Sequence, residues 1–233
     1  MTKKPFVTVI IPALNEADTL PQLISAIPSC ADRVVVVDNG STDNTGKIAN
    51  DAGADVIFEP RRGYGQACLS GIAHATDTDI FVFLDADFCD NPARMPELIN
   101  PILCGNADFV LGSRMHGTAK HNLSFPQRFG NRLACMLMRI FWQAKYSDLG
   151  PFRAVTSDAL KRMNMQDRNF GWTVEMQIKA RQENLRILEI QVPYRARLFG
   201  QSKVSGTLKG VCLAGSKILY VIGREFLRGI LSR

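Results

Sequence analysis

The stretch DIFVFLDADF, from Asp79 to Phe88, decides the fold, because an apolar run ends there in two carboxylates one residue apart. The β-branched and aromatic residues up to Leu84 are typical of a strand that is covered on both faces. In open α/β sheets, ligands bind at the carboxyl ends of such strands, where Asp85 and Asp87 follow. Carboxylate oxygens are hard ligands that suit Mg²⁺ or Mn²⁺ carrying a diphosphate. The stretch therefore indicates chemistry on a nucleotide diphosphate, with a solvated turn as the alternative.

Composition bounds the class of protein. The 233 residues, of which 46% are hydrophobic, fit one α/β domain with an appendage. A net charge of +6 favours anionic partners such as nucleotides or a phospholipid surface, whereas no recognised module or aromatic ladder supports nucleic-acid binding. Six scattered cysteines indicate reduced thiols in a cytoplasmic protein, and the N-terminus predicts no export signal. Since no uncharged stretch approaches ~18 residues, we expect no membrane span.

The first half of the chain, from Val7 to Arg114, alternates short apolar runs with helical patterns, which predicts parallel strands joined by crossover helices. The expected strands are Val7–Pro12, Arg33–Val37, Asp55–Phe58, Ile80–Leu84 and Asp108–Leu111. The expected helices are near Thr19–Ile27, Asn44–Ala52, Gly65–Thr76 and Pro92–Leu103. In the second half, helical patterns cover Asn131–Gln143 and the region around Trp172–Glu183, and we expect this half to shape an acceptor site.

Polar groups follow three of the expected strands, in PALNE (12–16), DNGSTD (38–43) and DAD (85–87). Asp38 is placed to accept an N–H from a nucleobase edge, and turn or helix-capping chemistry is the alternative. Ser41 and Thr42 are expected to cap the following helix and to form an anion site. In RRGYGQ (61–66), two arginines and two glycines suit a phosphate cradle that includes Gly65, and a plain loop is the alternative. The segment lacks the third glycine of the dinucleotide fingerprint.

Seven motifs in order carry a specific resemblance: VTVIIPALNE (7–16), VVVDNGSTD (35–43), GYGQA (63–67), LDAD (84–87), LGSR (111–114), GPFRA (150–154) and GWTVEMQ (171–177). The series resembles glycosyltransferase family 2, particularly its polyprenyl-phosphate (dolichyl-phosphate) mannosyl- and glucosyltransferase branch, from Val7 to about Gly206. The resemblance implies a GT-A fold, which is an α/β, Rossmann-like, mostly parallel sheet flanked by helices. It also implies inversion at the anomeric carbon of a nucleotide sugar.

The resemblance assigns a donor site. By similarity, the residues that bind the nucleotide sugar are Pro12, Leu14, Glu16, Asp38, Gly65, Asp85, Ala86, Asp87, Arg197 and Lys203. Within this set Asp38 reads the base, and Asp85 and Asp87 hold Mg²⁺ or Mn²⁺. Some relatives have a further metal-binding glutamine where this chain has Cys89, and a soft thiol suits Mg²⁺ poorly, so we expect water or a diphosphate oxygen there.

An acceptor phosphate requires cations that align it with the anomeric carbon, and arginine is suited to this task. Arg114, Arg128 and Arg132 are the candidates, with a solvated basic face as the alternative. A lipid phosphate is largely a dianion at neutral pH and needs no general base. Arg153 and Glu175 match family positions beside the sugar and the acceptor, and we assign both to catalysis together with Asp87 and Arg114.

The segment YRARLFGQSK (194–203) resembles a family motif in which Arg197, Ser202 and Lys203 close over the diphosphate, with a surface loop as the alternative. The last segment, Thr207 to Arg233, has the pattern of an amphipathic helix. Its apolar arc comprises Val211, Ile218, Ile222, Phe226 and Ile230, and its basic arc comprises Lys209, Lys217, Arg224 and Arg228. Such a helix suits an anionic leaflet, while packing on the protein's own core or on a second subunit explains the apolar arc equally well.

Together these features predict a GT-A domain over residues 1–206, with a nucleotide-sugar half (1–114) and an acceptor half (115–206), and an amphipathic segment over 207–233. The expected activity moves mannose or glucose from a UDP- or GDP-sugar to polyprenyl phosphate at the inner face of the membrane. A membrane-embedded partner or a homodimer would complement a chain without spans. The alternatives are a soluble transferase that acts on a hydroxyl acceptor, which requires a general base, and a non-catalytic nucleotide-binding or scaffold protein.

Overall fold

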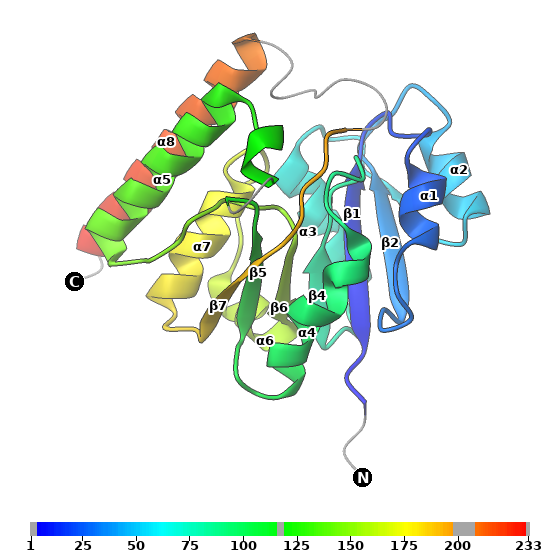
Figure 1. The fold of residues 1–233 in the computed structure, drawn as a ribbon, viewed down its shortest axis with the longest axis horizontal. Helices are drawn as coiled ribbons and strands as arrows, with labels where there is room; N and C mark the ends of the chain where they lie inside the picture. Colours follow the sequence, from blue (N-terminus) through cyan, green and yellow to red (C-terminus); the bar gives the residue numbers. More distant parts are fainter. Residues whose placement is uncertain (1–3, 116–118, 198–207, 232–233) are drawn as a thin grey trace.

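A seven-stranded sheet in the order β3-β2-β1-β4-β6-β5-β7 forms the centre of the computed structural model, which describes residues 4–115, 119–197 and 208–231 (Figure 1). The strands are β1 (Val7–Ala13), β2 (Arg33–Asp38), β3 (Asp55–Phe58), β4 (Ile80–Phe83), β5 (Phe109–Ser113), β6 (Arg153–Thr156) and β7 (Ile187–Gln191). All neighbouring pairs are parallel except those of β6, which runs antiparallel to β4 and β5. The predicted α/β class and mostly parallel sheet are confirmed.

Helices cover both faces of the sheet. They are α1 (Leu20–Ser25), α2 (Thr45–Asp51), α3 (Tyr64–His74), α4 (Met95–Leu103), α5 (Phe125–Trp142), α6 (Ser157–Met163), α7 (Trp172–Gln182) and α8 (Leu208–Leu231), with short 3₁₀ turns at Pro92–Arg94 and Ala119–Asn122. In β4, Ile80 and Val82 belong to the core against α1 and α4, while Phe81 and Phe83 belong to the core against α3, α6 and α7. All four β4 residues are buried, as expected for a strand covered on both faces.

The five predicted strands are present within one or two residues, but β6, α6 and β7 were not predicted. Helix α5 begins at Phe125 rather than Asn131, because Ser124 and Gln127 form a capping box. The predicted cap on α2 was wrong, since Asn44 is its N-cap residue. Ser41 Oγ instead accepts the N–H of Asn15 at 2.9 Å, which joins the loops after β1 and β2.

Helices α5 and α8 lie side by side and stand away from the sheet beyond α7 (Figure 1). Three residues of the predicted apolar arc of α8 turn toward this body: Ile222 is buried, Ile218 packs against the same cluster, and the ring centroid of Phe226 lies 4.4 Å from that of Phe141. The alternative of packing on the protein's own core therefore holds for these three, whereas Ile230 is 54% exposed and the side chain of Val211 lies outside the described residues. Three members of the basic arc, Lys217, Arg224 and Arg228, pair with buried carboxylates.

Both helices nevertheless carry large exposed apolar side chains at helical spacing. We call them the apolar stripes: Phe125, Phe129, Met136 and Ile140 on α5, and Leu213, Tyr220, Leu227 and Leu231 on α8. Among the described residues, no helix is long and apolar enough to cross a bilayer.

Candidate active site

A cleft of about 420 Å³, the donor cleft, opens at the carboxyl ends of β1, β2 and β4. Seven of the predicted donor-site residues line it together: Pro12, Leu14, Glu16, Asp85, Ala86, Asp87 and Arg197. The parallel strands explain this convergence, since their carboxyl ends meet at one edge of the sheet.

The two aspartates after β4 lie in a strongly polar setting. Desolvation in the cleft raises the pKa of Asp85 to about 6, and the negative charge of Asp87 adds to the shift. The hydroxyl of Tyr64 donates to Asp85 Oδ1 at 2.8 Å. Asp87 Oδ1 accepts the N–H of Cys89 at 3.0 Å, and Asp87 Oδ2 lies 3.0 Å from Arg197 Nη2. Two carboxylates that repel each other in this way are a natural site for a compensating cation.

The donor set fits a hard divalent cation. Asp85 and Asp87 offer carboxylate oxygens, which Mg²⁺ and Mn²⁺ prefer. Burial raises the pKa of the Cys89 thiol to about 12, so the soft sulfur stays protonated and is a poor ligand. Within the described part of the chain, no cluster of three or more Asp, Glu, His or Cys side chains is suited to hold a metal. The remaining coordination positions would therefore fall to water or to a diphosphate.

Arg197 bridges two walls of the cleft. Its Nη1 lies 2.9 Å from Glu16 Oε1, after β1, and its Nη2 contacts Asp87, after β4. Arg197 thus lines the cleft in which the diphosphate is expected, and its closure over that group stays a prediction. Ser202 and Lys203, the other two residues of the predicted lid, lie outside the described residues.

Asp38 and Gly65, both predicted to bind the nucleotide, are not among the residues that line the cleft. Asp38 Oδ1 accepts the N–H of Ser41 at 2.8 Å. This oxygen therefore stabilises the turn after β2, which was the alternative to binding the nucleobase. A Cβ at Gly65 would lie 2.0 Å from the carbonyl oxygen of Asp167. The glycine therefore makes room for the protein's own backbone. That backbone belongs to a segment distant in sequence, which motif reasoning did not reveal.

The cleft also contains residues that sequence reasoning missed: Asn39, Tyr64, Asn169 and Phe170. Tyr64 lies between the two glycines of GYG, so its place in a motif was an available signal. Asn39 donates to the carbonyl oxygens of Glu59 and Arg61 at 3.0 and 2.8 Å and thereby fixes the loop before α3. Asn169 and Phe170 come from the loop before α7, for which the sequence offered no signal.

A second cavity of about 420 Å³, the apolar cavity, lies between α5, α8 and the start of α7. Leu123, Phe129, Leu133, Leu149, Ile218 and Leu219 contribute most of its apolar wall. Among the lining residues that the structure describes, Arg114 is the one with a charge, and Phe170 lines both this cavity and the donor cleft. Arg128 and Arg132, the other predicted acceptor ligands, are not among its lining residues, whereas Asn131, on the same helix, is.

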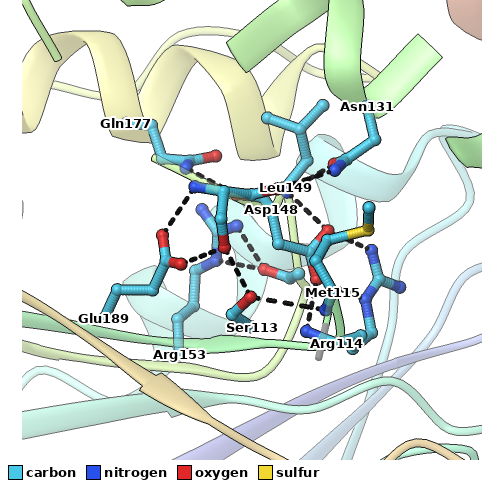
Figure 2. A network of polar contacts seen from close by, with 11 residues as sticks. Ser113, Arg114, Met115, Asn131, Asp148, Leu149, Arg153, Gln177 and Glu189 are labelled. Carbon is cyan, nitrogen blue, oxygen red and sulfur yellow. Dashed lines mark hydrogen bonds and ion pairs between the residues drawn. The ribbon is translucent and has the colours of Figure 1, made fainter. Parts of the chain in front are cut away.

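Figure 2 shows how Arg114 is held. The Arg114 backbone N–H and Nε both donate to Asp148 Oδ2 at 2.8 Å, and its Nη2 donates to Oδ1 at 3.0 Å. Burial acts against both charges, but their mutual attraction prevails, so the pKa of Arg114 is raised and that of Asp148 is lowered. Gln177 Nε2 donates to the Asp148 carbonyl oxygen at 2.9 Å. The guanidinium is therefore fixed in one orientation and remains charged.

Comparison with known proteins agrees with this geometry. Residues 8–163 match the family described as Glycosyl transferase family 2. The chain belongs to this family. An uncharacterized glycosyltransferase of Mycobacterium tuberculosis is 36% identical over 89% of this chain and 94% of its own length. The undecaprenyl-phosphate mannosyltransferase of Micrococcus luteus is 28% identical over 88% of this chain and 89% of its own length.

Solved structures show the same fold. The glucosyl-3-phosphoglycerate synthase of M. tuberculosis, in complex with Mn²⁺, UDP and phosphoglyceric acid, has a TM-score of 0.77 at 22% identity. The match covers 95% of this chain and 78% of the synthase. This likeness supports the expected GT-A architecture.

Two residues predicted to act beside the sugar are buried in this glycosyltransferase and line neither cavity. Arg153 is 0% exposed; its Nε donates to the carbonyl oxygen of Gly150 at 3.0 Å and its Nη1 to that of Thr173 at 3.1 Å. Desolvation lowers the pKa of Arg153 to about 10. Glu175, also 0% exposed, pairs with Lys179 and Arg224 at 3.0 and 2.9 Å. The structure therefore places both side chains within the protein rather than at the cleft surface.

Proposed function

We propose that this glycosyltransferase moves a hexose, mannose or glucose, from a UDP- or GDP-sugar to polyprenyl phosphate, with inversion, at a membrane surface. The observation that carries the proposal is the position of the apolar cavity. It adjoins the donor cleft through Phe170, and in the described part of the chain Arg114 is the one charged residue that lines it. An acceptor with a phosphate head and a hydrocarbon tail matches this combination of one fixed cation and an apolar wall.

On the donor side, Asp85 and Asp87 would hold Mn²⁺ or Mg²⁺, which neutralises charge that develops on a departing nucleoside diphosphate. Arg197, which pairs with both Glu16 and Asp87, supplies a second positive charge between the two walls of the cleft. The Mn²⁺ and UDP bound to the mycobacterial synthase support this assignment by analogy of fold.

On the acceptor side, Arg114 orients the phosphate. Asp148 engages its Nε and Nη2, and Nη1 makes no hydrogen bond within the described ranges, so this end of the guanidinium is available to a ligand. A phosphate monoester has a second pKa near 6 and is therefore already nucleophilic at pH 7. The work of Arg114 is to align it with the anomeric carbon.

The burial of Glu175 supports a phosphate acceptor over a hydroxyl acceptor. A hydroxyl group needs a general base within hydrogen-bond reach, and Glu175 was the predicted candidate. Both of its carboxylate oxygens are engaged inside the protein, by the N–H groups of Gln166 and Asp167 and by two cations. This carboxylate is therefore poorly placed to take a proton from a substrate.

The apolar stripes on α5 and α8 support contact with a membrane. Large side chains such as Phe125 and Leu231, which are 72% and 86% exposed, belong to the two helices that enclose the apolar cavity. Such a face suits the headgroup and acyl boundary of a leaflet, and the net charge of +6 adds attraction to anionic lipids. A bilayer would thus deliver the acceptor tail directly to the cavity.

The deciding experiment incubates the protein with a panel of UDP- and GDP-sugars, Mn²⁺ and polyprenyl phosphate, and follows the labelled sugar into the organic phase. Parallel reactions replace the lipid with 3-phosphoglycerate or a free sugar. We expect transfer to the lipid alone, and transfer slowed by about 10³-fold in Asp87→Asn. Transfer only to a water-soluble acceptor would contradict the proposal. Hydrolysis of the donor without transfer to any acceptor would contradict the part of the proposal that names polyprenyl phosphate.

A further inference from the structure

The loop over residues 166–171, here called the bridging loop, lies between α8 and the donor cleft. Its Asn169 and Phe170 line the cleft. Its first residues are held from inside the protein, since the N–H groups of Gln166 and Asp167 donate to Glu175 Oε2 at 3.1 and 2.7 Å. The position of this part of the cleft wall therefore depends on a carboxylate that does not reach the cleft.

Helix α8 makes two ion pairs at this loop, one with Asp167 in the loop itself and one with Glu175 in α7, which binds the loop's N–H groups. Lys217 Nζ lies 2.8 Å from Asp167 Oδ2, and Arg224 Nη2 lies 2.9 Å from Glu175 Oε1. Both carboxylate side chains are 0% exposed. A Cβ added at Gly171 would lie 2.5 Å from Val221 Cγ2, so the helix also packs closely on the loop. Because a buried charge without its partner is costly, these contacts seat α8 and the loop in one arrangement.

The opposite side of the bridging loop rests on the start of α3. The carbonyl oxygen of Arg168 accepts the N–H of Gln66 at 2.9 Å. A Cβ at Gly63 would lie 2.1 Å from that same oxygen, so only glycine permits the approach. Tyr64, next to Gly63, donates to Asp85 at 2.8 Å. Contacts thus run without a break from α8 through the loop to a carboxylate assigned to the metal.

We infer that Lys217 and Arg224 are positioning residues for the donor site. They set the affinity for the nucleotide by seating the bridging loop on the start of α3, although neither side chain lines the cleft. The inference rests on the proposed function, since it takes the cleft to bind a nucleotide sugar. Helix α8 also lines the apolar cavity.

The test compares the full chain with Lys217→Met and Arg224→Met, and uses Lys161→Met, at an exposed lysine on α6, as the matched control. Calorimetry measures the binding of UDP and of GDP with Mn²⁺, and hydrogen exchange of the Gln66 amide is followed without nucleotide. We expect about fivefold or more loss of affinity for the nucleotide that the wild type binds, and faster exchange at Gln66. The KM for the donor should rise by a larger factor than kcat falls. The conservative variant Lys217→Arg keeps the positive charge and should retain the wild-type values of KM and kcat.

If the folded variants exchange the Gln66 amide at the wild-type rate, the inference is overturned, whether or not a nucleotide binds. It is also overturned if the variants bind the nucleotide as tightly as the wild type does. A wild-type chain that binds neither UDP nor GDP would instead contradict the proposed function, while the exchange measurement still decides whether the two ion pairs seat the bridging loop on the start of α3. Where Lys217→Met does not fold, the pair Asp167→Asn with Lys217→Met serves in its place, because it leaves no buried charge without a partner. Asparagine retains the oxygen that accepts the N–H groups of Asn169 and Gly171.

Discussion

Asp87 has a different partner at each oxygen, the Cys89 N–H at Oδ1 and the Arg197 guanidinium at Oδ2. Asp87→Asn retains the size of the side chain and one oxygen but removes the negative charge. We expect transfer to slow by about 10³-fold, with weaker Mn²⁺ binding in electron paramagnetic resonance titrations. Asp158→Asn, at an exposed position on α6, is the control and should change neither. Wild-type Mn²⁺ binding by Asp87→Asn would show that the metal is held elsewhere.

Glu175 separates the two acceptor hypotheses. If the side chain has the role that its burial indicates, Glu175→Gln lowers the free energy of unfolding by about 3 kcal/mol, because Lys179 loses its ion-pair partner and Arg224 keeps only its pair with Glu225. The shape of the pH–rate profile should be unchanged, since the carboxylate takes no proton from the substrate. Chemical denaturation and a kcat/KM profile between pH 5 and 9 measure the two effects.

The control for Glu175 is Glu183→Gln, which removes the exposed ion pair with Arg162. That change should cost less than about 1 kcal/mol. Loss of a basic limb in the Glu175→Gln profile would instead identify a general base and favour a hydroxyl acceptor.

At the scale of elements, the loop between β3 and α3 depends on Glu59. Its Oε1 accepts from the N–H and the Nε of Arg61, both at 2.9 Å, and its Oε2 accepts from Ser70 Oγ at 2.5 Å. The side-chain hydrogen bond from Arg61 is the largest influence, and it holds the pKa of Glu59 well below its usual range.

A lowered pKa in the folded state means that the stabilisation by Glu59 is complete above the ordinary glutamate pKa of about 4.3 and is lost as the pH falls toward the folded value. We therefore expect Glu59→Gln to destabilise the protein at pH 7, and this difference to shrink as the pH falls below about 4. Urea denaturation from pH 7 to pH 3 measures it, with Glu97→Gln, in an exposed ion pair, as control. A difference that does not vary with pH would contradict the assignment.

The apolar stripes give the pair α5 and α8 a testable surface. Leu227→Ser with Leu231→Ser removes two exposed side chains from α8 without touching the core. We expect sedimentation with anionic vesicles to weaken by about tenfold, because each apolar side chain that enters the interface contributes roughly 1 kcal/mol or more. Phe58→Ser, at an equally exposed phenylalanine on the edge strand β3, is the control. Equal loss in both would indicate non-specific adhesion.

For the whole molecule, a cleft built from three strand ends should transmit ligand binding to global stability. UDP or GDP with Mn²⁺, at about 100 times its dissociation constant, should stabilise the fold by about 2.7 kcal/mol, and a chelator should remove most of this effect. The thermal midpoint would rise by roughly 5–10 °C. Asp87→Asn should show no metal-dependent rise. If the thermal midpoint responds to Mn²⁺ alone but to neither nucleotide, the metal site does not serve to bind the donor nucleotide.

Local pattern predicted most of the first half, because each β-α unit there has its own apolar period and its own turn residues. It did not predict β6, whose first residue, Arg153, brings a charge into the sheet, or β7, a partly exposed edge strand. In both cases the pairing partners come from distant segments, and tertiary contacts rather than propensity define the strand.

The candidate site divides in the same way. The residues of the DAD and PALNE motifs reach the cleft because a strand end determines where they lie. Arg153 and Glu175 resemble site residues in type and motif, but their partners, such as Thr173 and Arg224, are brought to them only by the folded chain. The glycines of GYG were read as room for phosphate, whereas the room is filled by backbone from residues 167–168.

The antiparallel strand β6 lies between β4 and β5, although both of those strands are synthesised before it. On the ribosome, synthesis proceeds at about 5–20 residues per second, so several seconds pass between the synthesis of β5 and that of β6, which pairs with both β4 and β5. During that interval each presents an open edge to chaperones and to neighbouring nascent chains. The strand that leads into the twin aspartates is thus among the last in this half of the protein to acquire all of its backbone partners.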